Sequence, residues 1–200
     1  MRLSLTVPVL ALLAAAATAQ ERGEALFAER CAACHGPGGN GQISYIPLLA
    51  GQIPDYLAKQ LHAFRAEDGH PPKRPDDLMG PIAESLSADD IPALAAYLAG
   101  QTRQPDTPRD GADLDLGRKI YLDGNPDHGL PACVTCHRPD GQGIRPDFPN
   151  LAGQHPDYIQ RQLDGWMKVR GKPGKLMSLI VPLMQPDERK AVADYVAGLR

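Results

Sequence analysis

The chain of 200 residues contains one pattern twice. Residues 31–65 align without a gap to residues 133–167, and 16 of the 35 positions are identical. Past a four-residue deletion, the match resumes between residues 78–100 and 176–198. A duplication of this length predicts two small domains rather than one large domain. We expect these domains at 20–100 and 111–200, joined by the polar, Pro-containing linker 101–110.

Each copy has the pattern of a helical domain. Apolar residues recur at helical spacing after Pro54 and Pro156, and both prolines are placed as in the first turn of a helix. The final helix of the first copy is expected after a capping box formed by Ser87 and Asp90, and Pro186 is expected to start its counterpart. Neither copy contains the alternation of apolar and polar residues that is typical of a strand. The predicted fold class is all-α.

The first 19 residues have the composition of a secretory signal peptide. Arg2 precedes an apolar run of about 15 residues that ends in Ala17-Thr18-Ala19, an A-x-A cleavage site. The alternative is a membrane anchor, but the run is short for a spanning helix and Pro8 interrupts it. We therefore predict an exported protein whose signal peptide is residues 1–19.

The charge distribution argues against a nucleic-acid partner. The formal net charge is −3, whereas binding to a phosphate backbone needs a concentrated basic surface. Residues 20–105 have seven Lys+Arg and 11 Asp+Glu, and residues 106–200 have 13 of each. A basic cluster in the second copy predicts a docking surface for an acidic partner, with an ordinary solvated loop as the alternative. The cluster consists of Lys168, Arg170, Lys172 and Lys175.

All four cysteines of the chain belong to two C-x-x-C-H motifs. These motifs contain Cys31, Cys34 and His35 in the first copy and Cys133, Cys136 and His137 in the second. Disulfides would leave both histidines unexplained, and a thioredoxin-like site expects a βαβ context. Structural zinc is a further alternative, although its ligand pairs normally lie within a few tens of residues of each other.

The C-x-x-C-H spacing is the signature of covalently attached haem c. Each thiol adds to a vinyl group of the porphyrin as a thioether, and the adjacent histidine is held beneath the iron as its proximal ligand. The sequence therefore predicts two haem c groups, with His35 and His137 as iron ligands. Zinc and disulfides stay as the alternatives.

The sixth ligand of each iron separates an electron carrier from an enzyme. A methionine thioether favours ferrous iron and raises the reduction potential, whereas an open position could bind peroxide or oxygen. In the first copy Met79 is the candidate, with a gap-filling role in the core as the alternative. In the second copy the alignment pairs Met79 with Met177, and it favours Met177 over Met184 and Met167.

The two motifs, the repeated segment "LAGQ-x-P-D-Y" and a methionine before each final helix resemble the dihaem c-type cytochromes of the cytochrome c4 family. The resemblance covers nearly all of residues 20–200. It implies two class I cytochrome c domains in tandem, each wrapped around one covalently attached haem with His and Met as axial ligands. It also implies that Pro47 and Pro149, twelve residues after their histidines, offer their backbone carbonyls to the histidine ring N–H.

The same resemblance implies a periplasmic one-electron carrier, sometimes associated with the membrane surface. Its donor would be a quinol-oxidising complex or a dehydrogenase, and its acceptor a terminal oxidase. One alternative is a cytochrome subunit that accepts electrons from a periplasmic dehydrogenase. A dihaem enzyme such as a peroxidase is disfavoured, because it needs an open iron site and both copies offer a methionine. We therefore expect an electron-transfer protein and not an enzyme.

Two further sets of polar residues are notable. The pairs Gln52/Gln154 and Tyr56/Tyr158 recur in both copies, and we expect them near the haem or at the interface between the halves. Four histidines have no counterpart in the other copy, and exposed or capping roles are expected for them: His62, His70, His128 and His155.

Overall fold

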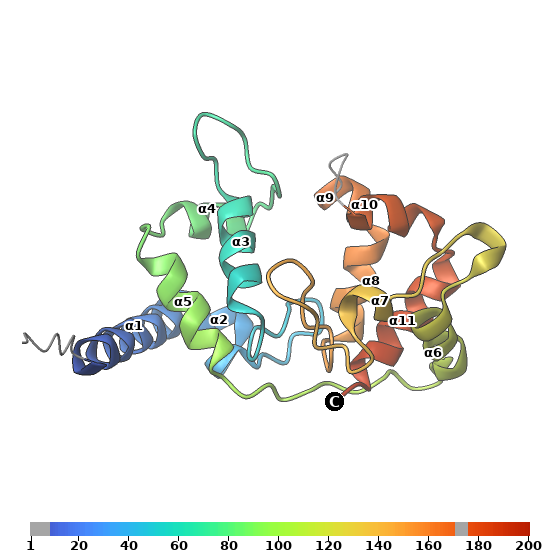
Figure 1. Ribbon diagram of the computed structural model, residues 1–200. Helices are drawn as coiled ribbons and strands as arrows, with labels where there is room; N and C mark the ends of the chain where they lie inside the picture. Colours follow the sequence, from blue (N-terminus) through green and yellow to red (C-terminus); the bar gives the residue numbers. More distant parts are fainter. Residues whose placement is uncertain (1–8, 171–175) are drawn as a thin grey trace, which may run out of the picture.

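The computed structural model describes residues 9–170 and 176–200 as two helical units side by side (Figure 1). The first unit contains α1 (Val9–Arg30), α2 (Ala32–His35), η1 (Pro37–Gly39), α3 (Pro54–Phe64), α4 (Met79–Glu84) and α5 (Asp90–Ala99). The second contains α6 (Leu114–Asp123), η2 (Pro126–His128), α7 (Val134–His137), α8 (Pro156–Asp164), α9 (Trp166–Val169), α10 (Leu176–Ile180), η3 (Val181–Leu183) and α11 (Pro186–Ala197). The described ranges contain isolated β-bridges and no strand, so the all-α prediction is confirmed.

The first and last long helices of each unit cross at a glycine. Helix α1 packs against α5, and α6 packs against α11. A Cβ atom on Gly23 would lie 2.2 Å from the carbonyl oxygen of Ala93, and one on Gly117 would lie 2.3 Å from that of Ala191. The two helix backbones can approach this closely only because glycine has no side chain. The equivalent crossings show that the duplication in sequence is also a duplication in packing.

Each unit has its own apolar core beside this crossing. An aromatic pair lies at each one, with ring centroids 5.6 Å apart for Phe27 and Tyr97 and 5.3 Å apart for Tyr121 and Tyr195. The first core also contains Leu57, Leu86, Ile91, Leu94 and Leu98. The second also contains Ile120, Leu130, Ile159, Leu163, Val181, Met184, Val192 and Val196. Because each unit buries its own set of apolar side chains, each has the anatomy of a small domain.

The predicted helix starts are confirmed. Helices α3, α8 and α11 begin at Pro54, Pro156 and Pro186. Before α5, the Asp90 carboxylate accepts a hydrogen bond from the backbone N–H of Ser87 at 2.8 Å, and the Ser87 hydroxyl accepts one from the N–H of Asp90 at 3.3 Å. This reciprocal pair is the expected capping box.

Helix α1 continues through the expected cleavage position. It runs without interruption from Val9 to Arg30 and therefore includes both Ala19 and Gln20. Residues 1–8 of the expected signal peptide lie outside the described residues. Of the helices that are described, none is both long and apolar enough to cross a membrane. Cleavage stays a prediction.

An extended segment connects the units and runs along one side of both (Figure 1). In this segment Arg103 donates from Nε to the carbonyl of Ala50 at 2.9 Å and from Nη1 to that of Ala152 at 2.8 Å. Further along, the Arg109 guanidinium donates to the buried Asp194 carboxylate at 2.7 Å. Charge-assisted hydrogen bonds therefore tie the segment to both units.

Candidate functional site

Each C-x-x-C-H motif forms a single helical turn. Cys31 immediately precedes α2 and Cys133 immediately precedes α7. Helical residues three and four positions apart are neighbours, so both cysteines and the histidine of a motif share one side of the turn. None of the four cysteines forms a disulfide. Before any group is attached, burial raises the pKa of Cys31 and that of Cys133 to about 11, whereas the cysteines of redox-active pairs have lowered pKa values.

The two motif histidines have matching environments. Both are buried, and Nδ1 of His35 lies 3.0 Å from the carbonyl oxygen of Pro47, while Nδ1 of His137 lies 3.1 Å from that of Pro149. A carbonyl oxygen can only accept, so Nδ1 carries the proton and Nε2 keeps its lone pair. Burial lowers the pKa of both histidines, although the bond to proline opposes this. A neutral imidazole with a free Nε2 is the form that binds a metal, and the proline contacts implied by the resemblance are present.

The residue after each histidine has a positive φ angle. Gly36 has φ 70° and ψ 168°, and Arg138 has φ 66° and ψ 160°. Glycine adopts this region freely, whereas a residue with a Cβ atom is strained there. The hydroxyl of Tyr121 donates to the carbonyl of Arg138 at 2.7 Å and helps to hold the conformation. The second copy therefore contains backbone strain beside its motif histidine.

Replacing Arg138 with glycine is expected to raise the free energy of unfolding by about 1 kcal/mol, because glycine adopts the conformation without strain. Denaturant unfolding of the purified protein would measure the change. The reciprocal control is Gly36→Ala, where the added Cβ would lie 2.4 Å from the Cα atom of Gly41 and should destabilise the first unit. An unchanged stability of the Arg138 variant would show that its backbone is not strained.

The methionine candidates lie in three different environments. Met79 is the first residue of α4, Met177 is the second residue of α10, and both are partly buried. Met184 is only 4% exposed and packs in the core of the second unit, in the place that Leu86 occupies in the first. Met167 is 54% exposed. Met184 thus packs in the core and Met167 lies at the surface, and the choice of Met177 as the counterpart of Met79 stays a prediction from the alignment.

Two guanidinium groups lie where the units meet. Arg170 donates to the hydroxyls of Tyr56 at 2.8 Å and Tyr158 at 3.0 Å, and it is 7% exposed. Arg74 donates to the side-chain oxygens of Gln60 at 2.8 Å and Gln162 at 3.2 Å. Neither arginine forms an ion pair within the described residues, and Nε of Arg170 is buried without a hydrogen-bond partner there. This arrangement concentrates positive charge away from water.

This positive charge provides a test of whether a haem fits. Burial and the neighbouring charge of Arg170 lower the pKa of Arg74. Burial alone would raise the pKa of Tyr158, but the charges of Arg170 and Arg74 lower it. Buried cations normally have an anionic partner. Haem c carries two propionate carboxylates, which would supply the anionic partner that these two arginines lack among the described residues.

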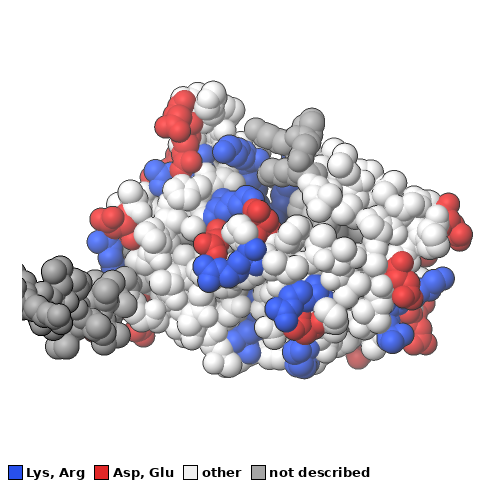
Figure 2. Space-filling view, in the orientation of Figure 1, with Lys and Arg blue, Asp and Glu red and all other residues white. Residues whose placement is uncertain are grey.

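Sequence reasoning did not find this pair of arginines. Arg170 was expected on a basic docking surface, and that expectation is wrong because its side chain is buried among tyrosines. Lys168 of the same cluster is exposed, and Lys172 and Lys175 lie outside the described residues. Figure 2 shows acidic side chains at both outer ends of one face, so this face has no acidic half opposite a basic one. The repeated tyrosines were the only available signal for the arginines.

One of the four histidines that have no counterpart in the other copy is buried between the units. His155 is 3% exposed, with Nδ1 2.5 Å from a carboxylate oxygen of Asp106 and Nε2 3.0 Å from the carbonyl oxygen of Gly41. The expectation of an exposed or capping side chain is therefore wrong for His155. His62 and His70 are exposed, as expected. His155 joins the second unit to the connecting segment and to the loop after the first motif.

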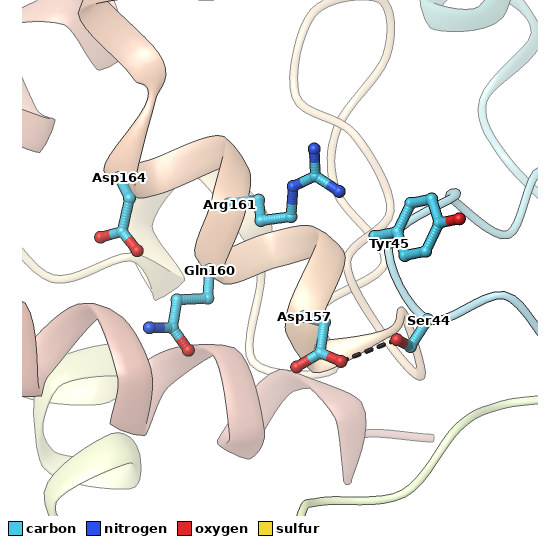
Figure 3. A pocket seen from close by; sticks show the side chains of 6 residues that line it. All are labelled: Ser44, Tyr45, Asp157, Gln160, Arg161 and Asp164. Atoms are coloured by element: carbon cyan, nitrogen blue, oxygen red, sulfur yellow. Dashed lines mark hydrogen bonds between the residues drawn. The ribbon is translucent and has the colours of Figure 1, made fainter.

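A surface groove of about 330 Å³ lies at the junction of the units. Figure 3 shows that Ser44 donates to Asp157 at one end, at 2.7 Å, while Arg161 points toward the ring of Tyr45. The lining residues are Ser44, Tyr45, Asp157, Gln160, Arg161 and Asp164. None of them belongs to a C-x-x-C-H motif or is a candidate haem ligand.

Comparison with known proteins gives one consistent result. The cytochrome c family model matches residues 20–102 and again residues 114–200. Cytochrome c4 of Thiocapsa roseopersicina is 37% identical over 187 residues, which cover 90% of this chain and 92% of that protein. The thiosulfate dehydrogenase electron acceptor of Stutzerimonas stutzeri is 37% identical over 175 residues, covering 84% and 78%. The structure of reduced cytochrome c4 from Pseudomonas stutzeri superposes with a TM-score of 0.80 at 31% identity, covering 90% and 98%.

Proposed function

Because the chain belongs to the dihaem cytochrome c4 family, we propose that it carries single electrons in the periplasm from a donor complex to a terminal oxidase. Its two cytochrome c domains hold two covalently bound haem c groups. When bound, haem c supplies an iron centre that takes up and releases one electron. The observation that carries the proposal is the buried histidine of each unit, whose Nδ1 donates to a proline carbonyl and whose Nε2 therefore keeps its lone pair for a metal.

Each copy contributes an equivalent set of ligands. Cys31, Cys34, Cys133 and Cys136 would hold the haems through thioether bonds, and the iron ligands would be His35 and Met79 in the first domain and His137 and Met177 in the second. The proline carbonyls orient the imidazoles and increase their basicity as ligands. The methionine thioethers would favour the ferrous state and would occupy the position that peroxide or oxygen would need. These roles suit electron transfer without a catalytic step.

The domain limits follow from the same reasoning. We assign residues 1–19 to a cleaved signal peptide, 20–100 and 111–200 to the domains, and 101–110 to the linker. The first match to the cytochrome c family begins at residue 20, and the two matches leave residues 103–113 between them. Both facts support this division, and a signal peptide would direct the chain to the periplasm.

A second candidate function is acceptance of electrons from a periplasmic dehydrogenase. The relative from Stutzerimonas stutzeri is named a thiosulfate dehydrogenase electron acceptor, and its match covers 84% of this chain. The haem ligands would be the same in both functions. The difference would lie in the donor, which would be a catalytic subunit rather than a quinol-oxidising complex.

The purified holoprotein is expected to contain two haems per chain and to show near-infrared charge-transfer absorption from Met to iron for both. Mixing reduced protein with membranes that contain a terminal oxidase should oxidise it rapidly. Mixing oxidised protein with thiosulfate and a thiosulfate dehydrogenase tests the second function. A single haem, or a haem that binds peroxide in the oxidised protein, would overturn the assignment as a two-site carrier.

A further inference from the structure

A glutamine of the second unit binds the peptide group next to the first motif histidine. Gln154 is 3% exposed and reaches into the first unit. Its Oε1 accepts from the backbone N–H of Leu48 at 2.8 Å, and its Nε2 donates to the carbonyl of Leu48 at 2.9 Å. The side-chain amide therefore pairs with a backbone segment as a neighbouring strand would.

A glutamine of the first unit makes the equivalent pair of hydrogen bonds with the second unit. Gln52 of the first unit is 6% exposed, and its Oε1 accepts from the backbone N–H of Asn150 at 2.8 Å. Its Nε2 donates to the carbonyl of Asn150 at 2.9 Å. Leu48 and Asn150 occupy the same position in the repeat. Each unit thus holds the other through the same pair of hydrogen bonds.

These contacts continue directly to the motif histidines. The N–H of Leu48 and the carbonyl of Pro47 belong to one peptide group, and that carbonyl accepts from Nδ1 of His35 at 3.0 Å. In the other unit, the N–H of Asn150 and the carbonyl of Pro149 likewise form one peptide group. Hydrogen bonds in such a chain polarise one another, so an acceptor on the N–H makes the carbonyl a stronger acceptor.

We propose that Gln154 tunes the haem of the first domain and Gln52 the haem of the second, each through the peptide group that binds the opposite proximal histidine. The inference rests on the proposed function, since it takes His35 and His137 as iron ligands. A stronger carbonyl acceptor gives the imidazole more imidazolate character, which favours ferric iron. Each glutamine therefore lowers the reduction potential of the haem in the opposite domain.

If each glutamine acted only within its own unit, its substitution would affect a different haem. Oε1 of Gln154 also accepts from the N–H of His155 at 3.1 Å, and Oε1 of Gln52 accepts from that of Ile53 at 3.0 Å. These bonds lie within the glutamine's own unit, at the start of α8 and α3. If they were the whole role, substitution would disturb the haem of the same domain. Tuning through the peptide group disturbs the haem of the opposite domain.

The test compares Gln154→Met with Gln52→Met in the full-length holoprotein. In the reduced protein, Gln154→Met is expected to move the NMR signal of the His35 Nδ1–H and to leave that of His137 in place. Gln52→Met should move the signal of the His137 Nδ1–H and leave that of His35 in place. The reduction equilibrium constant of the affected haem should rise about threefold to tenfold, where tenfold corresponds to about 59 mV for a one-electron couple.

Two controls keep the result interpretable. Gln142→Met changes an exposed glutamine of the second domain and should move neither histidine signal. Gln154→Glu retains an acceptor for the Leu48 N–H if the methionine variant does not fold, and should lower the potential of the first haem more than that of the second. The tuning would be refuted if a substitution changed the histidine signal and the reduction potential only in the glutamine's own domain, or changed them equally in both domains. If no haem-bound histidine signal exists in the unmodified protein, the proposed function itself has failed.

Discussion

Replacing Cys133 and Cys136 together with alanine is expected to halve the haem content, from two covalently bound groups per chain to one. The second motif would lose both thioether bonds, while Cys31 and Cys34 would still hold the first haem. Haem absorbance per protein and the mass of the intact chain would measure the loss. Because the two units have separate apolar cores, we expect the first to keep its spectrum.

The matched control is the double replacement of Cys31 and Cys34, which should leave the other haem in place. A chelator should remove nothing from the unmodified protein, whereas structural zinc would be extracted and the fold weakened. Two haems remaining in the Cys133/Cys136 variant would contradict the assignment. A released zinc ion would support the competing interpretation of the motifs.

Replacing Met177 with alanine is expected to lower one of the two reduction potentials substantially. Axial ligands set haem potentials over a span of about 0.8 V, so loss of a thioether should cost on the order of 0.1 V or more. Half of the near-infrared absorption from Met to iron should disappear. A redox titration followed by visible and near-infrared absorbance measures both effects, and the vacated position should bind added imidazole.

Two other methionine variants identify the ligands. Met79→Ala should have the same effect on the other haem, since Met79 occupies the matching position. Met184→Ala should reduce the free energy of unfolding by about 2–5 kcal/mol, because Met184 fills the core, and leave both potentials in place. If Met184→Ala removes the absorption and Met177→Ala does not, the alignment has selected the wrong residue.

Local features of the fold were predictable from the sequence. The helix starts at Pro54, Pro156 and Pro186 depend on the fixed φ angle of proline and on nearby apolar periodicity, so they appear where expected. The capping box of Ser87 and Asp90 involves residues three positions apart. Such features are decided by neighbours along the chain, which a single sequence displays directly.

The repeated pairs Gln52/Gln154 and Tyr56/Tyr158 were expected near the haem or at the interface, and they do form contacts between the halves, but the partners in those contacts were not predictable. Arg170 was read as part of a surface cluster because nearby lysines share its charge, yet its partner Tyr56 is 114 residues away. His155 has no counterpart in the first copy, and its contact with Gly41 also spans 114 residues. The repeat of Tyr56 as Tyr158 indicates an interface or haem position but does not identify Arg170 as its partner, and Gly41 gives no signal for His155. Burial at an interface depends on how two folded units meet.

The sequence by itself determined what each half binds and how its backbone is built, because C-x-x-C-H spacing, proline position and helical periodicity act within a few residues. Only the tertiary structure decided how the halves are joined. It brought Arg74 and Arg170 to the junction of the units with no carboxylate paired to either one among the described residues. It also placed Gln52 and Gln154 in hydrogen bonds with the peptide groups that bind the motif histidine of the opposite unit. These contacts arise from the docking of two complementary surfaces, whose shape no segment of the chain contains alone.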